Sequence, residues 1–332
     1  MQSFFPAFTA RAPWWGGHLQ TFAGMLPRRH DLDRYPGERL TVVVPDGTGD
    51  RLVATLHRPA KRAGQRRCLI LLVHGVSGSQ NSSYILASAA FFLNLGYSVL
   101  RCNLRGAGPS RRLCKRQYHA GTTEDLDHII AGLPPTLRED GIVAVGYSLG
   151  ANIVLKFLGE RGQAAPVQAA VLVSSPLDLA VTTRRLMQWD NALFHRPMLS
   201  LLKAESLRPA SDLTARERRA ISDARTIQDF DEHFTAPRNG FSGAFEYYKR
   251  TSCRHFLNLV SVPSLLIYAL DDPLVPYADY LKYEWHRNQN LVPLMSRFGG
   301  HIGFQGLDRD ASWHDACAAR FVEMLFSHTV WH

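Results

Sequence analysis

Short runs of apolar residues alternate along this chain with longer segments in which apolar residues recur every three or four positions. The runs predict strands at Thr41–Val44, Arg51–His57, Cys68–Val73, Ser98–Asn103, Ile142–Val145, Ala169–Ser174, Ser264–Ala269 and Pro293–Arg297. The periodic segments predict helices at Ser82–Leu95, Glu124–Leu133, Leu149–Glu160 and His314–Ser327. The first two strands flank a glycine-containing turn and are expected to pair antiparallel. This order predicts an α/β fold, in which helices cover both faces of a mostly parallel eight-stranded sheet.

One serine lies in a motif that connects a predicted strand to a predicted helix. Residues 146–150 read GYSLG, directly after the strand at Ile142–Val145. G-x-S-x-G in this context predicts a nucleophile elbow, because side chains at the two glycines would collide with the strand and the helix. The Ser148 hydroxyl would be exposed, and the Leu149 N–H at the helix N-terminus could face a developing oxyanion. The alternative is a glycine-rich turn that carries a solvated serine.

A serine nucleophile needs a base and an orienting acid. On the fold in which a nucleophile elbow occurs, the two follow the serine along the chain, first the acid and then the histidine. Asp271 and Asp272 lie at the C-terminal end of the strand Ser264–Ala269, where ligands meet an open α/β sheet. We favour Asp272 as the acid, because it directly precedes a Pro-Leu-Val turn. Asp271 is the alternative acid, and otherwise we expect it to cap the turn or to face solvent. Asp178 is a further alternative, and its simpler interpretation is a helix N-cap.

The candidate base is His301, one of 14 histidines. It follows an apolar stretch and two glycines, which permit a tight loop that returns the imidazole over the sheet edge. The other C-terminal histidines are expected to be structural or solvated, and they are His314, His328 and His332.

The second oxyanion donor is expected in the loop after the strand Cys68–Val73. The backbone N–H of Val76 is the candidate partner of the Leu149 N–H. His74, at the start of this loop, is interpreted as a hydrogen-bonding brace, and a catalytic role for it is the alternative.

Several further motifs accompany these candidates. They are HLQT at 18–21, HG at 74–75 with GS at 78–79, NLRG at 103–106, YHAG at 118–121 with EDL at 124–126, GYSLGAN at 146–152, DDP at 271–273 and GGHIGF at 299–304. Through these motifs nearly the whole chain resembles α/β-hydrolase family 4, the group of YheT-type hydrolases. The resemblance implies the α/β-hydrolase fold and a catalytic triad of Ser148, Asp272 and His301. It also implies hydrolysis of carboxylic esters, of short-chain or lipid-like type.

The strand–helix alternation lapses after the sixth core strand, between Asp178 and Val262. This segment predicts helices at Leu179–Trp189, Pro197–Leu207, Ala215–Ala220 and Ser242–Thr251. We expect one α/β-hydrolase domain over residues 1–332, with a helical cap insertion at 179–262 and an N-terminal extension at 1–38 that wraps the core. The cap should cover a mostly apolar acyl pocket, in which a charged acyl group would lack a partner. Its candidate packing and lining residues are Trp189, Phe194, Met198, Phe230, Phe234, Phe241, Tyr247 and Tyr248.

Composition narrows the class of protein. The chain has 332 residues, 45% of them hydrophobic and 20% charged, which is typical of an ordinary globular protein. Its apolar runs are of strand length, so stable membrane insertion is not expected, and its first residues do not resemble a signal peptide. Five cysteines without paired spacing favour a reducing cytoplasm and argue against a disulfide framework or a metal site. The net charge of +9 comes from scattered residues without a nucleic-acid-binding motif, so no nucleic-acid partner is expected.

The leading hypothesis is therefore a serine carboxylesterase that acts on a small-molecule ester through an acyl-enzyme and needs no cofactor. An acyltransferase would use the same triad and pass the acyl group to an alcohol or thiol. Epoxide hydrolases and dehalogenases on this fold need a carboxylate nucleophile, which Ser148 argues against. A non-catalytic binding or scaffold protein on the same fold is the remaining alternative.

Overall fold

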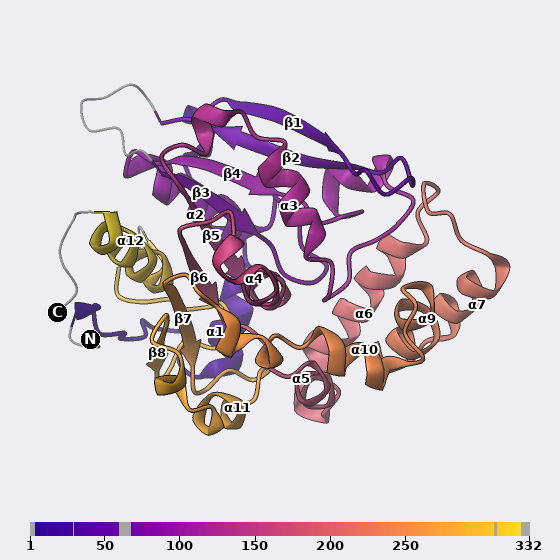
Figure 1. The fold of residues 1–332 in the computed structure, drawn as a ribbon. Helices are drawn as coiled ribbons and strands as arrows, with labels where there is room; N and C mark the ends of the chain where they lie inside the picture. The colour runs from indigo at the N-terminus through magenta and orange to yellow at the C-terminus, as the bar shows by residue number, and fades with distance from the viewer. Residues whose placement is uncertain (1–3, 29, 60–67, 309–310, 327–332) are drawn as a thin grey trace.

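The structure is a computed structural model, and it describes residues 4–28, 30–59, 68–308 and 311–326. These residues form one eight-stranded sheet in the order β1-β2-β4-β3-β5-β6-β7-β8 (Figure 1). The strand β2 is antiparallel to both of its neighbours, and all other neighbouring strands are parallel. The strands are β1 (Gly37–Val43), β2 (Arg51–His57), β3 (Leu69–Val73), β4 (Ser98–Cys102), β5 (Ile142–Tyr147), β6 (Ala169–Val173), β7 (Ser264–Ala269) and β8 (Leu291–Ser296). The predicted fold class is confirmed.

Helices cover both faces of the sheet, so every residue of β3 to β7 is buried (Figure 1). Alternate residues of β3 belong to two separate cores. Leu69 and Leu71 pack on the face covered by α3 and α4, and Ile70 and Leu72 pack on the face covered by α2 and α12. In the described part of the chain the α-helices are α1 (Gly17–Met25), α2 (Ser83–Asn94), α3 (Glu124–Ala131), α4 (Leu149–Arg161), α5 (Leu179–Leu186), α6 (Ala192–Ser206), α7 (Ala215–Asp223), α8 (Ile227–Phe230), α9 (Ala236–Arg238), α10 (Ala244–Thr251), α11 (Tyr277–Lys282) and α12 (Trp313–Phe326).

Several boundaries differ from the predicted ones. The strand β1 begins at Gly37, four residues before its predicted start, and β8 begins at Leu291. The helix α6 begins at Ala192, and it contains Pro197, which we expected at the helix start. The helix α1 lies in the segment for which the sequence predicted only a wrapping extension. The predicted end of the last helix, and the histidines at 328 and 332, fall outside the described residues.

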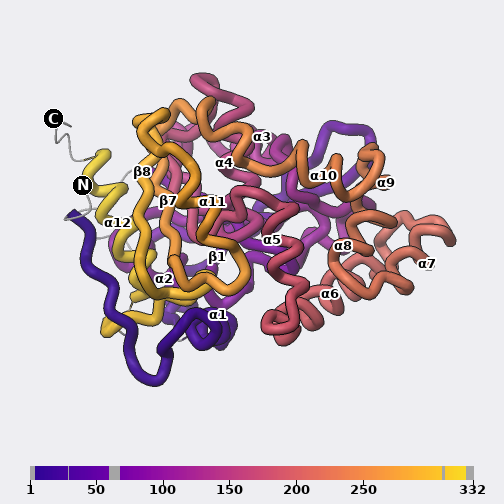
Figure 2. Tube along the Cα trace, turned by 90° about the horizontal axis from the view of Figure 1, so that it is seen from below, coloured from indigo at the N-terminus to yellow at the C-terminus, as the bar shows by residue number. Residues whose placement is uncertain are grey.

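The helices α5 to α10 connect β6 to β7 and extend away from one end of the sheet (Figures 1 and 2). We call residues 179–262 the cap segment. It has a hydrophobic cluster of its own, in which Phe194, Ile227 and Phe230 are buried. The same cluster contains Leu274, from the loop after β7 that also carries Asp272. Packing of this cluster therefore links the cap segment directly to one of the candidate catalytic loops.

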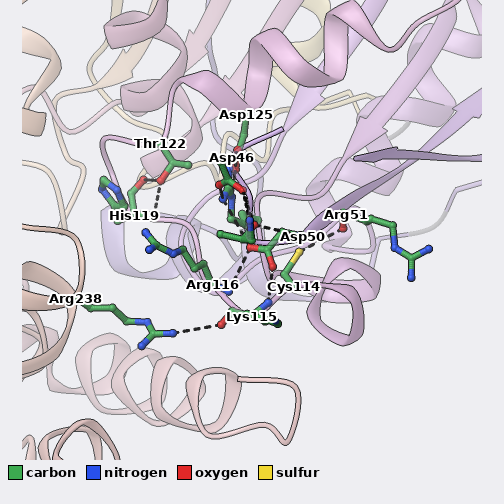
Figure 3. Close-up of polar contacts among 12 residues, drawn as sticks. Asp46, Asp50, Arg51, Cys114, Lys115, Arg116, His119, Thr122, Asp125 and Arg238 are labelled. Atoms are coloured by element: carbon green, nitrogen blue, oxygen red, sulfur yellow. Dashed lines mark hydrogen bonds and ion pairs between the residues drawn. The ribbon is translucent and has the colours of Figure 1, made fainter. Parts of the chain in front are cut away.

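A buried ion network ties the loop after β4 to the sheet edge. The Arg105 guanidinium, 4% exposed, contacts Asp125 on α3 and Asp46 in the β1–β2 turn. Asp50 accepts hydrogen bonds from the backbone N–H groups of Lys115, at 2.6 Å, and of Arg116, at 3.3 Å (Figure 3). Arg238 from the cap segment donates to the Lys115 carbonyl at 3.4 Å (Figure 3). This network fixes the loop that carries Tyr118 toward the candidate site.

Candidate active site

The turn between β5 and α4 places Ser148 in a strained backbone conformation, with φ 51° and ψ −121°. A Cβ atom at Gly146 would lie 2.7 Å from the Ala151 Cα, and one at Gly150 would lie 2.4 Å from the His74 carbonyl oxygen. Both glycines are thus needed for the close approach of strand and helix, as the motif predicts. A non-glycine residue in this backbone region is characteristic of functional turns.

The structure brings Ser148, His301 and Asp272 together in one hydrogen-bonded chain. His301 Nε2 lies 2.8 Å from Ser148 Oγ, and His301 Nδ1 lies 2.8 Å from Asp272 Oδ2. The other carboxylate oxygen of Asp272 accepts the backbone N–H groups of Leu274 and Val275 at 2.8 and 3.0 Å. Because the carboxylate can only accept, the hydrogen-bond network assigns the imidazole proton to Nδ1 and leaves the Nε2 lone pair facing the serine hydroxyl.

The alternative residues have other partners. Asp271 Oδ1 accepts the N–H of Gly300 at 2.8 Å, and burial raises the pKa of the Asp271 carboxyl above its usual value. Asp178 caps α5 by accepting two backbone N–H groups of its first turn. His314 is buried on α12, with its ring against those of Tyr147 and a phenylalanine. None of these three side chains hydrogen-bonds His301 in the described residues.

The loop after β3 holds Val76 beside the serine. The N–H groups on either side of Val76 donate to tyrosine hydroxyls, that of Gly75 to Tyr84 at 2.9 Å and that of Ser77 to Tyr118 at 2.7 Å. By contrast, the N–H groups of Val76 and Leu149 have no acceptor within the described residues. Two unused donors next to a candidate nucleophile are what an oxyanion site requires.

His74 braces this loop from beneath. The N–H of Leu104 donates to His74 Nε2 at 3.1 Å, so the other ring nitrogen carries the proton and donates to the Gly75 carbonyl at 2.8 Å. Complete burial lowers the pKa of His74 to about 4, which keeps the ring neutral. A neutral ring with both nitrogens occupied is suited to bracing and not to proton transfer.

Two cavities meet at Ser148, Val76 and His301. The first, of about 140 Å³, lies beneath the cap segment, and most of its lining is apolar. Side chains from the cap and from the loop after β7 form this apolar lining, and they include Leu186, Met198, Leu202, Ile227, Phe230, Phe234 and Leu274. The second, of about 690 Å³, is wider and lies between α1 and α6. Its apolar walls include Leu19, Phe22, Met25, Leu193 and Leu201.

The cap cavity also holds acidic groups that the sequence did not predict. Asp231 accepts a hydrogen bond from the Tyr248 hydroxyl at 2.7 Å, and the Glu205 Oε2 atom is buried without a partner in the described part of the chain. Burial raises the pKa of Glu205 to about 7 and that of Asp231 to about 6. Polar and charged residues are among the neighbours of both acids in the sequence, so no sequence signal distinguishes them from solvated acids. Their presence modifies the expected pocket, because a hydrogen-bond donor on the substrate would find an acceptor there.

No group of three or more histidine, cysteine or acidic side chains that could hold a metal ion occurs in the described ranges. The five cysteines are all free and buried. Among the helices that the structure describes, none has the length and apolar character needed to cross a membrane.

Comparison with known families identifies the class of protein. A family model described as the alpha/beta hydrolase fold matches residues 69–302, which is more than half of the chain. The chain therefore belongs to the α/β-hydrolase family and is a hydrolase.

Its relatives narrow the resemblance. The chain is 31% identical to the "Putative esterase YheT" of Escherichia coli, over 87% of this chain and 84% of that protein. It is 27% identical to the human "Phospholipase ABHD3", over 79% of this chain and 65% of that protein. It is 28% identical to the "Medium-chain fatty acid ethyl ester synthase/esterase 2" of Saccharomyces cerevisiae, over 76% of this chain and 61% of that protein. The chain thus spans most of YheT and under two thirds of the two eukaryotic relatives.

Solved structures support the same fold. The Pyrococcus furiosus esterase Pf2001 matches with a TM-score of 0.59 and 17% identity, over 90% of this chain and 97% of that chain. A 2,6-dihydroxy-pseudo-oxynicotine hydrolase matches with a TM-score of 0.61 and 15% identity, over 93% of this chain and 72% of that chain. At these identities the likeness shows the fold alone.

Proposed function

We propose that this protein is a serine carboxylic-ester hydrolase for short- to medium-chain or lipid-like esters, with Ser148, His301 and Asp272 as its triad. The observation that carries the proposal is the pair of 2.8 Å hydrogen bonds that joins these side chains at the junction of two cavities. A solvated serine or a binding protein on the same fold would not need an acid and a base aligned on one hydroxyl.

In the proposed reaction, the Ser148 oxygen attacks the ester carbonyl carbon while His301 Nε2 takes the hydroxyl proton. Asp272 holds the ring in the required tautomer and stabilises the imidazolium. The N–H groups of Val76 and Leu149 stabilise the oxyanion. His301 then gives its proton to the departing alcohol. Water, deprotonated by the same nitrogen, attacks the acyl-enzyme, and the carboxylic acid leaves as Ser148 regains its proton.

The two cavities suggest where the acyl and alcohol parts of the ester bind. We assign the acyl group to the cavity beneath the cap segment, because side chains of that segment form most of its lining and most of the lining is apolar. We assign the alcohol to the wider cavity beside α1, which has room for a bulky or lipid-like group. The names of the relatives, an esterase, a phospholipase and a medium-chain ester synthase/esterase, support an ester substrate with an acyl chain.

The wider cavity also favours a second activity on the same triad. An alcohol that occupied it after the first leaving group could attack the acyl-enzyme in place of water and give a new ester.

The five free, buried cysteines support the expectation that the protein works in the reducing cytoplasm.

The test uses p-nitrophenyl esters and two serine variants. We expect the wild-type protein to hydrolyse them and Ser148→Ala to lose on the order of 10⁴-fold in kcat/KM. Ser264→Ala is the matched control, because Ser264 lies at the start of β7 and its hydroxyl donates to the nearby Val262 carbonyl at 3.0 Å. Near wild-type turnover by a folded Ser148→Ala would exclude the proposed mechanism.

A further inference from the structure

The helix α1 lies against the two loops that carry the proposed acid and base. We call residues 297–305, which follow β8, the base loop. Thr21 on α1 accepts the backbone N–H of His301 at 2.9 Å and donates its own hydroxyl proton to the Gly17 carbonyl at 2.7 Å. Thr21 is only 1% exposed, so this hydrogen bond is buried and its loss would leave the His301 N–H without its protein acceptor.

Backbone contacts hold the helix and the loops close together. A Cβ atom at Gly17 would lie 1.7 Å from the Asp271 carbonyl oxygen, and one at Gly300 would lie 2.4 Å from the Gly17 carbonyl oxygen. Gln20, the residue before Thr21, is fully buried and accepts the N–H of Gln305 at 2.7 Å. The helix α1 therefore packs directly against both candidate catalytic loops as well as against the core.

The base loop depends on side chains for its position. Three consecutive N–H groups of this loop donate to side-chain oxygens from three different parts of the chain, and not to backbone carbonyls. These bonds join Gly300 to Asp271 at 2.8 Å, His301 to Thr21 at 2.9 Å and Ile302 to Ser174 at 3.2 Å. Of the three, the Thr21 bond acts on the histidine itself.

Building on the proposed function, we propose that Thr21 is a positioning residue, which sets the place of the His301 imidazole through the His301 backbone N–H. Without the hydroxyl, that buried N–H would lose its acceptor, and the loop would shift to find another. A shift of the backbone moves Nε2 away from the Ser148 hydroxyl and from the leaving alcohol. Displacements of about 1 Å at a reacting group can cost about 10²-fold in rate.

The test compares Thr21→Val with Thr21→Ser and Thr21→Cys. Valine keeps the shape of threonine but cannot accept, serine keeps the hydroxyl, and the cysteine thiol is a weaker acceptor. We expect kcat for a p-nitrophenyl ester to fall about 10- to 100-fold in Thr21→Val, with KM within about threefold of wild type. Thr21→Ser should stay within about threefold of wild type in kcat, and Thr21→Cys should lie between serine and valine. If the valine variant does not fold, the order of the serine and cysteine variants decides.

Thr251→Val is the matched control. Thr251 is 2% exposed on α10 and donates to the carbonyl four residues before it at 2.7 Å, as Thr21 does, but it accepts nothing from the base loop. It should keep wild-type kcat. Equal kcat in the two valine variants, or a serine variant as slow as the valine variant, would overturn the role of Thr21. If the wild-type protein shows no esterase activity, or an activity that does not depend on Ser148, the proposed function itself is refuted.

Discussion

Replacing Asp272 by asparagine should disable the base without disturbing its surroundings. Asparagine fills the same space, and its carbonyl oxygen can still accept the N–H groups of Leu274 and Val275, which now bond Asp272 Oδ1 at 2.8 and 3.0 Å. Its amide nitrogen would then face His301 Nδ1 where a carboxylate oxygen now lies at 2.8 Å. Since an amide N–H donates, it favours the tautomer in which Nδ1 is unprotonated and Nε2 carries the hydrogen.

A protonated Nε2 cannot accept the Ser148 proton, and the imidazolium would lack its carboxylate partner. We therefore expect kcat to fall on the order of 10²- to 10⁴-fold, which corresponds to about 3–5 kcal/mol in the activation free energy. Asp271→Asn is the matched control, because the asparagine oxygen can keep the bond to the Gly300 N–H that Asp271 makes at 2.8 Å. Its kcat should change less than about tenfold.

The kcat of both variants is measured by steady-state hydrolysis of one p-nitrophenyl ester, and circular dichroism verifies that both are folded. A larger loss in Asp271→Asn than in Asp272→Asn would move the acid to Asp271. Equal, small losses in both variants would show that no carboxylate orients His301, and the reasoning from the two 2.8 Å bonds would be refuted.

Three further outcomes follow from the cap cavity. Activity should rise from acetyl to medium-chain p-nitrophenyl esters, by up to about fourfold in kcat/KM for each buried methylene, and then fall; a steady decline from acetate would refute a deep acyl pocket. An ester with a terminal carboxylate on its acyl group should be poorer than its neutral counterpart of equal length, because the carboxylate would lose its hydration against a mostly apolar lining, and equal rates would contradict this. Burial raises the pKa of Glu205 to about 7, so the folded protein binds the proton of this carboxyl more tightly than the unfolded chain does. The stability that this group contributes is therefore lost as the pH rises from about 4.5 through 7. Urea unfolding at pH 5 and pH 8 should show a smaller loss in Glu205→Gln, and parallel losses would count against the buried carboxyl.

The fold could be predicted because the core strands are short apolar runs and a helical pattern follows most of them, although α11 (Tyr277–Lys282), after β7, was not predicted. The strand β5 and the helix α4 are the clearest case, since the GYSLG motif marks the turn between them. The predicted start of helix α6 is five residues too late, because proline is favoured in the first turn of a helix, whereas Pro197 lies inside this one. The helix α1 was missed because Gly16 and Gly17 at its start, and a further glycine near its end, weaken the helical signal.

The candidate site was only partly accessible to sequence reasoning. Motif and chain order pointed to Ser148, Asp272 and His301, which the structure places in hydrogen-bonding distance. The contact between Thr21 and His301 spans 280 positions, so local patterns carry no trace of it. The buried acids of the cap cavity could not be predicted for a similar reason, because burial of Glu205 depends on packing between helices and not on the neighbouring residues in the sequence.

The central claim is that Ser148 is an activated nucleophile. The most direct measurement is mass spectrometry of the protein after treatment with a fluorophosphonate, which phosphonylates an activated serine without any choice of ester substrate. We expect one adduct per chain, on the peptide that contains Ser148, and none in Ser148→Ala. An unmodified wild-type protein, or an adduct on another serine that persists in Ser148→Ala, would contradict the account.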